Sequence, residues 1–256
     1  MSALFSPIIG VMLRAVRKSS KVLVRDFNEL RHLRSSYVAA SEFTRAAYQR
    51  SGKVIAEGLK EYKQGLGVLI EGSREPKELG DLFWYISPMD SRTNFMSGLP
   101  YFASTVALVK EGEVVAAVVD APVLRETYHA EKGFGAFYED THSRYIRMHV
   151  SRRENTNAMV VDFTAGCQKA RALTEELAKG QVVLRSLGSV ILGFSYLCAA
   201  YYDVLIYSGV QPYKAGIGKL FVEGSKGSFG QYADGVIVAG NFFLRDFVEK
   251  KLLESE

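Results

Sequence analysis

A short polar segment follows an apolar run about a third of the way along the chain. Residues 82–86 are apolar or aromatic, and the segment 87–94, with sequence SPMDSRTN, comes directly after them. In α/β proteins, ligands bind outside the carboxyl ends of strands. The backbone N–H groups of residues 91–93 are able to cradle a phosphate there, and the guanidinium of Arg92 is able to pair with it. The simpler interpretation is that Asp90 caps the next turn and that nothing binds.

The elements that must position this segment are two helices and a sheet in the first half of the chain. Ser6-Pro7 and apolar residues at helical spacing predict a helix from Pro7 to about Phe27, and a second helix runs from about Phe43 to Tyr62. We expect these two helices to pack together. Short apolar or β-rich runs predict strands, with a hairpin turn at 111–113, at residues 67–71, 82–86, 105–110, 114–119 and 127–130.

The second half alternates strand and helix. Strands are predicted at 159–162, 182–185, 204–206 and 235–241, and helices at 168–179, 188–200 and 242–253. We find no linker, low-complexity run or internal repeat. The prediction is therefore a single unit over residues 1–256, with an α+β half at about 1–150 that carries the motif loops and an α/β half at 151–256.

Composition narrows the class of protein. The chain has 256 residues, of which 48% are hydrophobic and 23% charged, which suits a layered α/β unit and excludes disordered and fibrous classes. A net charge of +4 is compatible with anionic ligands and far from that of a dedicated nucleic-acid binder, although a basic stripe at 14–25 leaves RNA or lipid contact open. With only Cys167 and Cys198, and an apolar stretch at 8–13 too short to span a membrane, we expect a cytoplasmic protein without a membrane partner.

The segment around Asp90 resembles a known signature. The pattern W-x-x-D-P-[IL]-D-G-T-T-N-F is matched by Trp84, Pro88, Asp90, Thr93, Asn94 and Phe95. Further matches run in the same order along the chain, at Glu42-Phe43, Leu69-Ile70-Glu71, Ala107-Leu108-Val109, residues 130–137, Arg185 with Gly188-Ser189, and residues 237–241. The chain therefore resembles the inositol monophosphatase family, and bacterial members including the extragenic-suppressor type most of all.

That resemblance implies an α/β fold, namely the layered α-β-α-β-α sandwich of the sugar phosphatases, and commonly a homodimer. It also implies phosphoric monoester hydrolysis of inositol phosphates. Such enzymes use Mg²⁺ held by a cluster of carboxylates, because hard oxygen ligands suit Mg²⁺ and the metal supplies both the activated water and the charge clamp.

Several positions depart from the family pattern. Glu71 and Asp90 remain as the only catalytic and metal-binding carboxylates, and family carboxylates are replaced at Ser87, Tyr48 and Lys214. The phosphate-binding residues that we expect are Ser91, Arg92 and Thr93 in the polar turn, together with the ammonium of Lys214. The substrate-binding positions are Gly188, Ser189 and Tyr207, and the last of these stands where the family has a glutamate that holds a substrate hydroxyl.

The replacement at Lys214 leads to a hypothesis. Its ammonium occupies the metal position and neutralises Glu71 and Asp90, which leaves a degenerate metal site that holds phosphate without an ion. The alternative is a lysine that points to solvent from a helix. Three functions then compete: a family member that binds a phosphorylated ligand without efficient hydrolysis, a residual Mg²⁺-dependent phosphatase working through Glu71 and Asp90, and a regulatory protein with an RNA or protein partner.

Overall fold

The computed structural model describes residues 5–33, 35–60, 62, 65–73, 79–139, 144–164, 166–232 and 235–254. Its helices are α1 (Pro7–Leu30), α2 (Tyr37–Lys60), α3 (Arg92–Ser97), α4 (Gln168–Ala178), α5 (Val190–Cys198), α6 (Pro212–Gly224) and α7 (Phe242–Glu254). The first sheet contains, in spatial order, β1 (Gly67–Ile70), β2 (Leu82–Asp90), β3 (Ala103–Lys110), β4 (Glu113–Ala121), β5 (Glu126–Glu131), β6 (Gly135–Glu139) and β7 (Tyr145–Arg147). The second contains β11 (Ser228–Gln231), β12 (Val236–Gly240), β10 (Val204–Ser208), β8 (Val160–Phe163) and β9 (Val183–Arg185).

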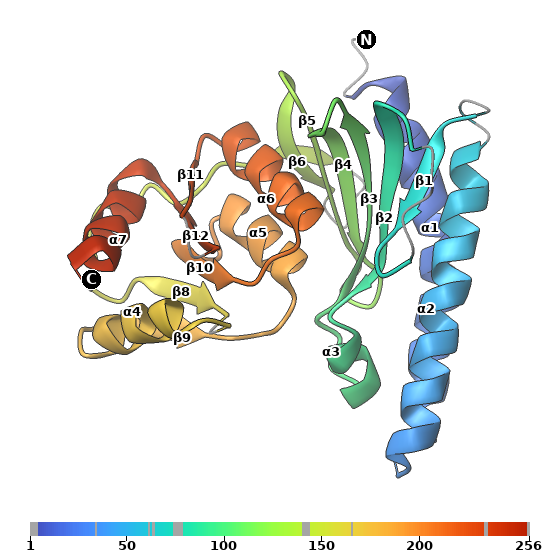
Figure 1. The fold of residues 1–256 in the computed structure, drawn as a ribbon, viewed down its shortest axis with the longest axis horizontal. Coiled ribbons are helices and arrows are strands. Elements are labelled where there is room, and N and C mark those ends of the chain that lie inside the picture. Colours follow the sequence, from blue (N-terminus) through green and yellow to red (C-terminus); the bar gives the residue numbers. More distant parts are fainter. Residues whose placement is uncertain are drawn as a thin grey trace.

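The elements stack in five layers (Figure 1). Helices α1 and α2 cover one face of the first sheet, where Trp84 and Ile86 pack among their apolar residues. Helices α5 and α6 lie between the two sheets, and α4 and α7 cover the far face of the second sheet through residues such as Leu173 and Leu244. The predicted α-β-α-β-α sandwich is confirmed.

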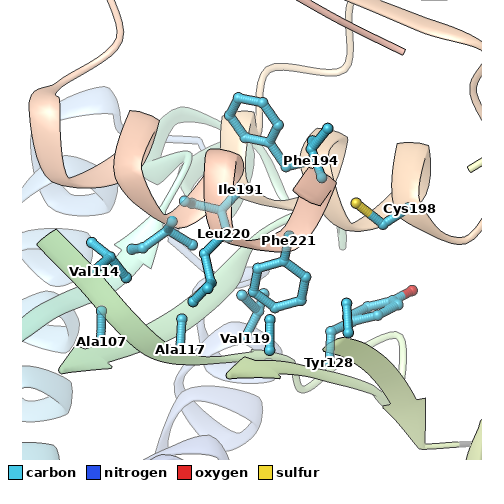
Figure 2. Packing of buried hydrophobic residues seen from close by; sticks show 14 of the residues in the cluster. Ala107, Val114, Ala117, Val119, Tyr128, Ile191, Phe194, Cys198, Leu220 and Phe221 are labelled. Atoms are coloured by element: carbon cyan, nitrogen blue, oxygen red, sulfur yellow. The ribbon is translucent and has the colours of Figure 1, made fainter. Parts of the chain in front are cut away.

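The largest core lies in the central layer (Figure 2). Ala117 and Val119 of the first sheet face Ile191 of α5 and Phe221 of α6, and all four are almost completely buried. Small side chains on the strand side allow the helices to approach, while the large side chains on the helices fill the space between the layers. The starts of α5 and α6 are thereby held against the first sheet.

The end of β2 differs from its sequence-based prediction. The sequence predicts a strand that ends at residue 86, before Pro88, but β2 continues to Asp90. The pairing with β3 shifts in register between Ser87 and Asp90, and such a bulge tolerates a proline because the missing N–H is not needed in the ladder. The carbonyl of Pro88 accepts hydrogen bonds from Ser51 Oγ at 3.1 Å and Ser104 Oγ at 2.7 Å. Two serines thus secure the strand just before its functional end.

Most other predicted elements are present with shifted ends. The second helix begins at Tyr37 rather than Phe43, and the hairpin turn consists of Glu111 and Gly112, both with positive φ as a tight two-residue turn requires. The strands β6, β7 and β11 and the whole of α6 were not predicted. Helix α6 is glycine-rich and buried on several sides, so its sequence lacks a clear amphipathic period.

No helix within the described ranges is long and apolar enough to cross a membrane. The described strands of the first sheet lie between residues 67 and 147 and those of the second between 160 and 240. The division of the chain near residue 150 and the cytoplasmic location stay predictions.

The contact between α5 and α6 gives a stability test. A Cβ added to Gly218 would lie 2.4 Å from the Phe194 ring, so Gly218→Ala must displace this buried ring or move the two helices apart. We expect it to lower the free energy of unfolding by about 1–3 kcal/mol. Gly10→Ala in α1 is the matched control, because its nearest neighbours lie at 3.6 Å and ordinary helix propensity then favours alanine by up to about 1 kcal/mol. Urea denaturation measures both, and stabilisation by both variants would contradict the tight contact.

Candidate functional site

Two parallel strands bring the surviving carboxylates to one edge of the first sheet. Strands β1 and β2 pair in parallel, and the N–H of Glu71, directly after β1, donates to Ile86 O at 2.8 Å. Asp90 is the last residue of β2. Lys214, the third residue of α6, reaches both: its Nζ lies 2.8 Å from Glu71 Oε1 and 2.7 Å from Asp90 Oδ1. The predicted contact of Lys214 with the two acids is present, and the alternative of a solvent-pointing lysine is wrong.

The remaining carboxylate oxygens also have hydrogen-bond donors. Ser87 Oγ donates to Glu71 Oε2 at 2.5 Å. Asp90 Oδ2 accepts from Ser189 Oγ at 2.6 Å and from the N–H of Ile191 at 2.9 Å. Each of the four oxygens is therefore already engaged. Nowhere in the described part of the chain do three or more His, Cys, Asp or Glu side chains gather in a way that could hold a metal ion.

Lys214 is held as a cation. Its side chain is 12% exposed, and those of Glu71 and Asp90 are 11% and 4% exposed. Burial alone would lower the pKa of the Lys214 ammonium, but the carboxylates of Asp90 and Glu71 together outweigh burial and raise that pKa above its ordinary value. The three side chains form a compact group with one positive and two negative charges.

The start of α5 supplies part of this arrangement. Ser189 is the N-cap of α5, where its Oγ accepts from the N–H of Leu192 at 3.3 Å while donating to Asp90. Gly188 before it has φ +83°, a backbone conformation that glycine adopts without strain. Sequence reasoning proposed both residues as substrate contacts and missed the bond to Asp90. The signal available was the capping serine before an apolar run.

Tyr48 connects α2 to the site. Its hydroxyl donates to the backbone carbonyl of Glu71, and the guanidinium of Arg92 lies over its ring, 4.8 Å from the centroid. Burial, assisted by the charge of Glu71, raises the pKa of Tyr48 above its ordinary value, so the phenol stays protonated and acts as a donor. An aromatic ring thus stands where the family pattern has a carboxylate, and it supports a cation instead.

The predicted phosphate loop borders an open pocket. Ser91 adopts the left-handed conformation with φ 65°, and Arg92 and Thr93 form the exposed first turn of α3. A pocket of about 570 Å³ lies between α2 and the end of β1, and its charged lining residues are Arg45, Lys53, Glu57, Lys60, Glu71 and Arg92. Four of these are cations, and one of the two acids, Glu71, is already bound to Lys214.

Tyr207 lies inside the second sheet. It is fully buried, its ring packs edge-on against Phe194 at 5.4 Å, and its hydroxyl donates to Asp162. Burial raises the pKa of the Asp162 carboxyl to about 6, although the bond from Tyr207 works in the opposite direction. The substrate role proposed for Tyr207 stays a prediction, and the observed partner of its hydroxyl is a buried acid.

Comparisons with known proteins agree with this fold and with the resemblance noted in the sequence. A sequence profile described as the inositol monophosphatase family matches residues 5–214. An inositol-1-monophosphatase of Rhizobium meliloti is 34% identical over 204 residues, covering 77% of this chain and 75% of that protein. A Nus factor SuhB of Xylella fastidiosa is 26% identical over 227 residues, with 86% and 80% covered. The crystal structure of extragenic suppressor protein suhB from Bartonella henselae superposes with a TM-score of 0.80 at 26% identity, covering 97% and 100%.

The Lys214 contacts give a stability test. Lys214→Met keeps the bulk and helix propensity of the side chain but leaves two buried carboxylates facing each other. We expect the free energy of unfolding at neutral pH to fall by about 3 kcal/mol, the scale for breaking one side of a buried ion pair. Lys219→Met, at an exposed position of the same helix, should change it by less than about 0.5 kcal/mol.

The difference in free energy of unfolding between the unmodified chain and Lys214→Met should depend on pH. The pKa of Lys214 is raised in the folded chain, so its protonation contributes to the free energy of unfolding. This contribution is fully present below the ordinary lysine pKa of 10.5 and is lost as the pH rises through the pKa of Lys214 in the folded chain. The gap between the unmodified chain and Lys214→Met should therefore narrow at strongly alkaline pH in chemical denaturation. Equal stability of the two chains at neutral pH would mean that the ion pairs contribute nothing net.

Proposed function

The chain belongs to the inositol monophosphatase family, and we propose that it binds a phosphorylated small molecule in the pocket beside Arg92 without the Mg²⁺-dependent hydrolysis typical of that family. The observation that carries the proposal is the simultaneous contact of Lys214 Nζ with Glu71 and Asp90, at 2.8 and 2.7 Å. A lysine at this point takes up the oxygens that a metal ion would need.

The residues present do not fit Mg²⁺. This ion prefers octahedral coordination by oxygen atoms and is usually bound through carboxylates. Ser87 contributes a hydroxyl where the family pattern has a carboxylate, and that hydroxyl donates to Glu71. Asp90 is bound by Ser189, Ile191 and Lys214 together. A metal ion would have to displace an ammonium and several hydrogen bonds to obtain two ligands.

The electrostatic scale supports the same conclusion. A divalent cation about 4 Å from an ammonium, at an effective dielectric constant of about 20, is repelled by roughly 8 kcal/mol, or about six decades of affinity. Movement of the lysine would relieve part of this repulsion. The same movement would break the ion pairs of Lys214 with Glu71 and Asp90, so Mg²⁺ binding would still be opposed by the loss of these contacts.

Phosphate binding is supported by the charges around the pocket. Arg92 is exposed, is fixed against the Tyr48 ring and lies next to the N–H groups of residues 91–93. Arginine pairs well with phosphate because its planar fork makes two parallel hydrogen bonds. Arg45 and Lys53 of α2 add positive charge to the same pocket. Lys214 contributes less than its sequence position suggests, because two of its three N–H donors already serve carboxylates.

A second candidate function is regulatory. Two relatives, of Xylella fastidiosa and Pasteurella multocida, carry the name Nus factor SuhB and are 26% and 24% identical to this chain. A chain with Tyr48, Ser87 and Lys214 at positions where the family pattern has carboxylates suits a role in which the protein acts through a binding surface and not through a reaction. We propose this as the alternative if the pocket proves empty of any phosphorylated ligand. A homodimer stays a prediction.

Hydrolysis is tested directly with inositol 1-phosphate. We expect the unmodified chain to release no phosphate in a Mg²⁺-dependent manner, because both carboxylates are engaged by Lys214. The double variant Lys214→Asp with Ser87→Asp should gain Mg²⁺ binding in calorimetric titration, since it replaces a cation and a hydroxyl by two ligands. Mg²⁺-dependent turnover by the unmodified chain, abolished by Glu71→Gln, would overturn the proposal in favour of a residual phosphatase.

Phosphate binding is tested separately, without metal. Titration of the unmodified chain with inorganic phosphate and with inositol 1-phosphate, followed by amide chemical shifts, should report binding at residues 91–93. Arg92→Ala should weaken it by roughly tenfold to 100-fold, the scale of a charge-assisted hydrogen bond. Arg31→Ala, an exposed arginine outside the pocket lining, is the matched control. If Arg92→Ala and the unmodified chain bind phosphate with equal affinity, the phosphate does not bind beside Arg92.

A further inference from the structure

A second pocket lies where three segments of the chain meet. Residues 149–152 with Glu154, residues 225–226 and residues 241–243 line a hollow of about 580 Å³, which shares no lining residue with the pocket beside Arg92. Hydrogen bonds join these segments: the side-chain amide Nδ2 of Asn241 donates to the carbonyls of Ser151 at 2.9 Å and Arg153 at 2.6 Å, and the backbone N–H of Val150 donates to Ser225 O at 3.1 Å. The walls are therefore held in place without a ligand.

Two phenylalanines form an exposed wall of this pocket. Phe242 and Phe243 are the first residues of α7 and are 75% and 50% exposed. The side of α7 that faces the core is formed by Leu244, Val248 and Leu252, which are fully buried, so the two phenylalanines are not needed for packing. Adjacent exposed aromatic rings that line a hollow provide flat apolar surface for a ligand.

The same pocket is electropositive. Arg152 and Lys226 are exposed, and no described carboxylate lies within 4.0 Å of either charged group. Beside them, partial burial and the charges of Lys226, Arg147 and Arg152 lower the pKa of His149. Glu154 is the only acid among the described lining residues. An anion bound here would relieve the repulsion among these cations.

We propose that this pocket binds a nucleoside monophosphate. Its phosphate would pair with Arg152 and Lys226, and its base would lie against Phe242 and Phe243. A bare phosphate leaves the aromatic wall uncovered, and a neutral aromatic compound leaves the cations unpaired, whereas a nucleotide satisfies both. The volume lies within the range of small-molecule pockets, and bases of any sequence stack on aromatic side chains.

Three probes separate the two halves of the pocket: AMP, adenosine and ribose 5-phosphate. The titrations use the full chain carrying Arg92→Ala, so that phosphate binding at the first pocket does not contribute. We expect AMP to bind more tightly than either fragment. Phe242→Ala with Phe243→Ala should weaken AMP roughly tenfold and leave ribose 5-phosphate almost unchanged, because only the base contacts the rings. Arg152→Ala with Lys226→Ala should weaken AMP and ribose 5-phosphate together, and added salt should weaken both as well.

The matched control is Phe134→Ala, which removes another exposed phenylalanine outside this pocket and should leave AMP binding unchanged. All substituted residues are exposed, and unfolding midpoints verify that each variant folds. Three results would overturn the proposal: absence of AMP binding, equal binding of AMP and ribose 5-phosphate, or AMP binding that survives both double substitutions. Binding of an oligonucleotide or an acidic peptide to this pocket in the absence of AMP binding would equally overturn it.

Discussion

The ion pairs of Lys214 connect four separate elements of the fold. The lysine belongs to the first turn of α6, Glu71 follows β1, Asp90 ends β2, and Asp90 in turn binds the start of α5 through Ser189 and Ile191. A buried ion pair offsets the loss of hydration only if hydrogen bonds also satisfy the remaining polar atoms of both groups. Removal of one partner lowers the stability of the fold, because it leaves an uncompensated buried charge. The ends of β1 and β2 and the starts of both central helices are therefore linked to each other through Lys214 and Asp90.

This arrangement is possible because the central helices lie close together and close to the sheet. Gly218 of α6 contacts the Phe194 ring of α5, and Gly216 lies against Val114 of β4, at distances that leave no room for a Cβ. Close packing of this kind holds the first turn of each helix in a fixed position, because a packed interior has low compressibility. The family pattern noted in the sequence has a carboxylate at the position of Lys214. In this chain the closely packed helix presents a cation at that position instead.

Charge is distributed over two pockets of different character. The first, beside Arg92, has one of its two acids, Glu71, neutralised by Lys214, so the four cations of α2 and α3 outnumber the remaining acid. The second, beside Lys226, combines unpaired cations with exposed aromatic rings. Its lining residues come from segments other than the ends of β1 and β2, which form the first site. The fold and the family do not determine which ligand either pocket binds, because binding depends on the individual side chains that line each pocket.

The sequence by itself determined the family, the layered α/β fold and most of its elements, because apolar periodicity and a long ordered series of motif matches are local properties of the chain. It also showed that a cation stands at residue 214 and a hydroxyl at residue 87. Only the tertiary structure decided where Lys214 points, since its partner Asp90 is 124 positions away, and that Ser189 serves Asp90 across 99 positions. It also decided that Pro88 is absorbed by a bulge and that Tyr207 turns to Asp162. These outcomes depend on how distant elements pack, and no local pattern of residue types encodes that packing.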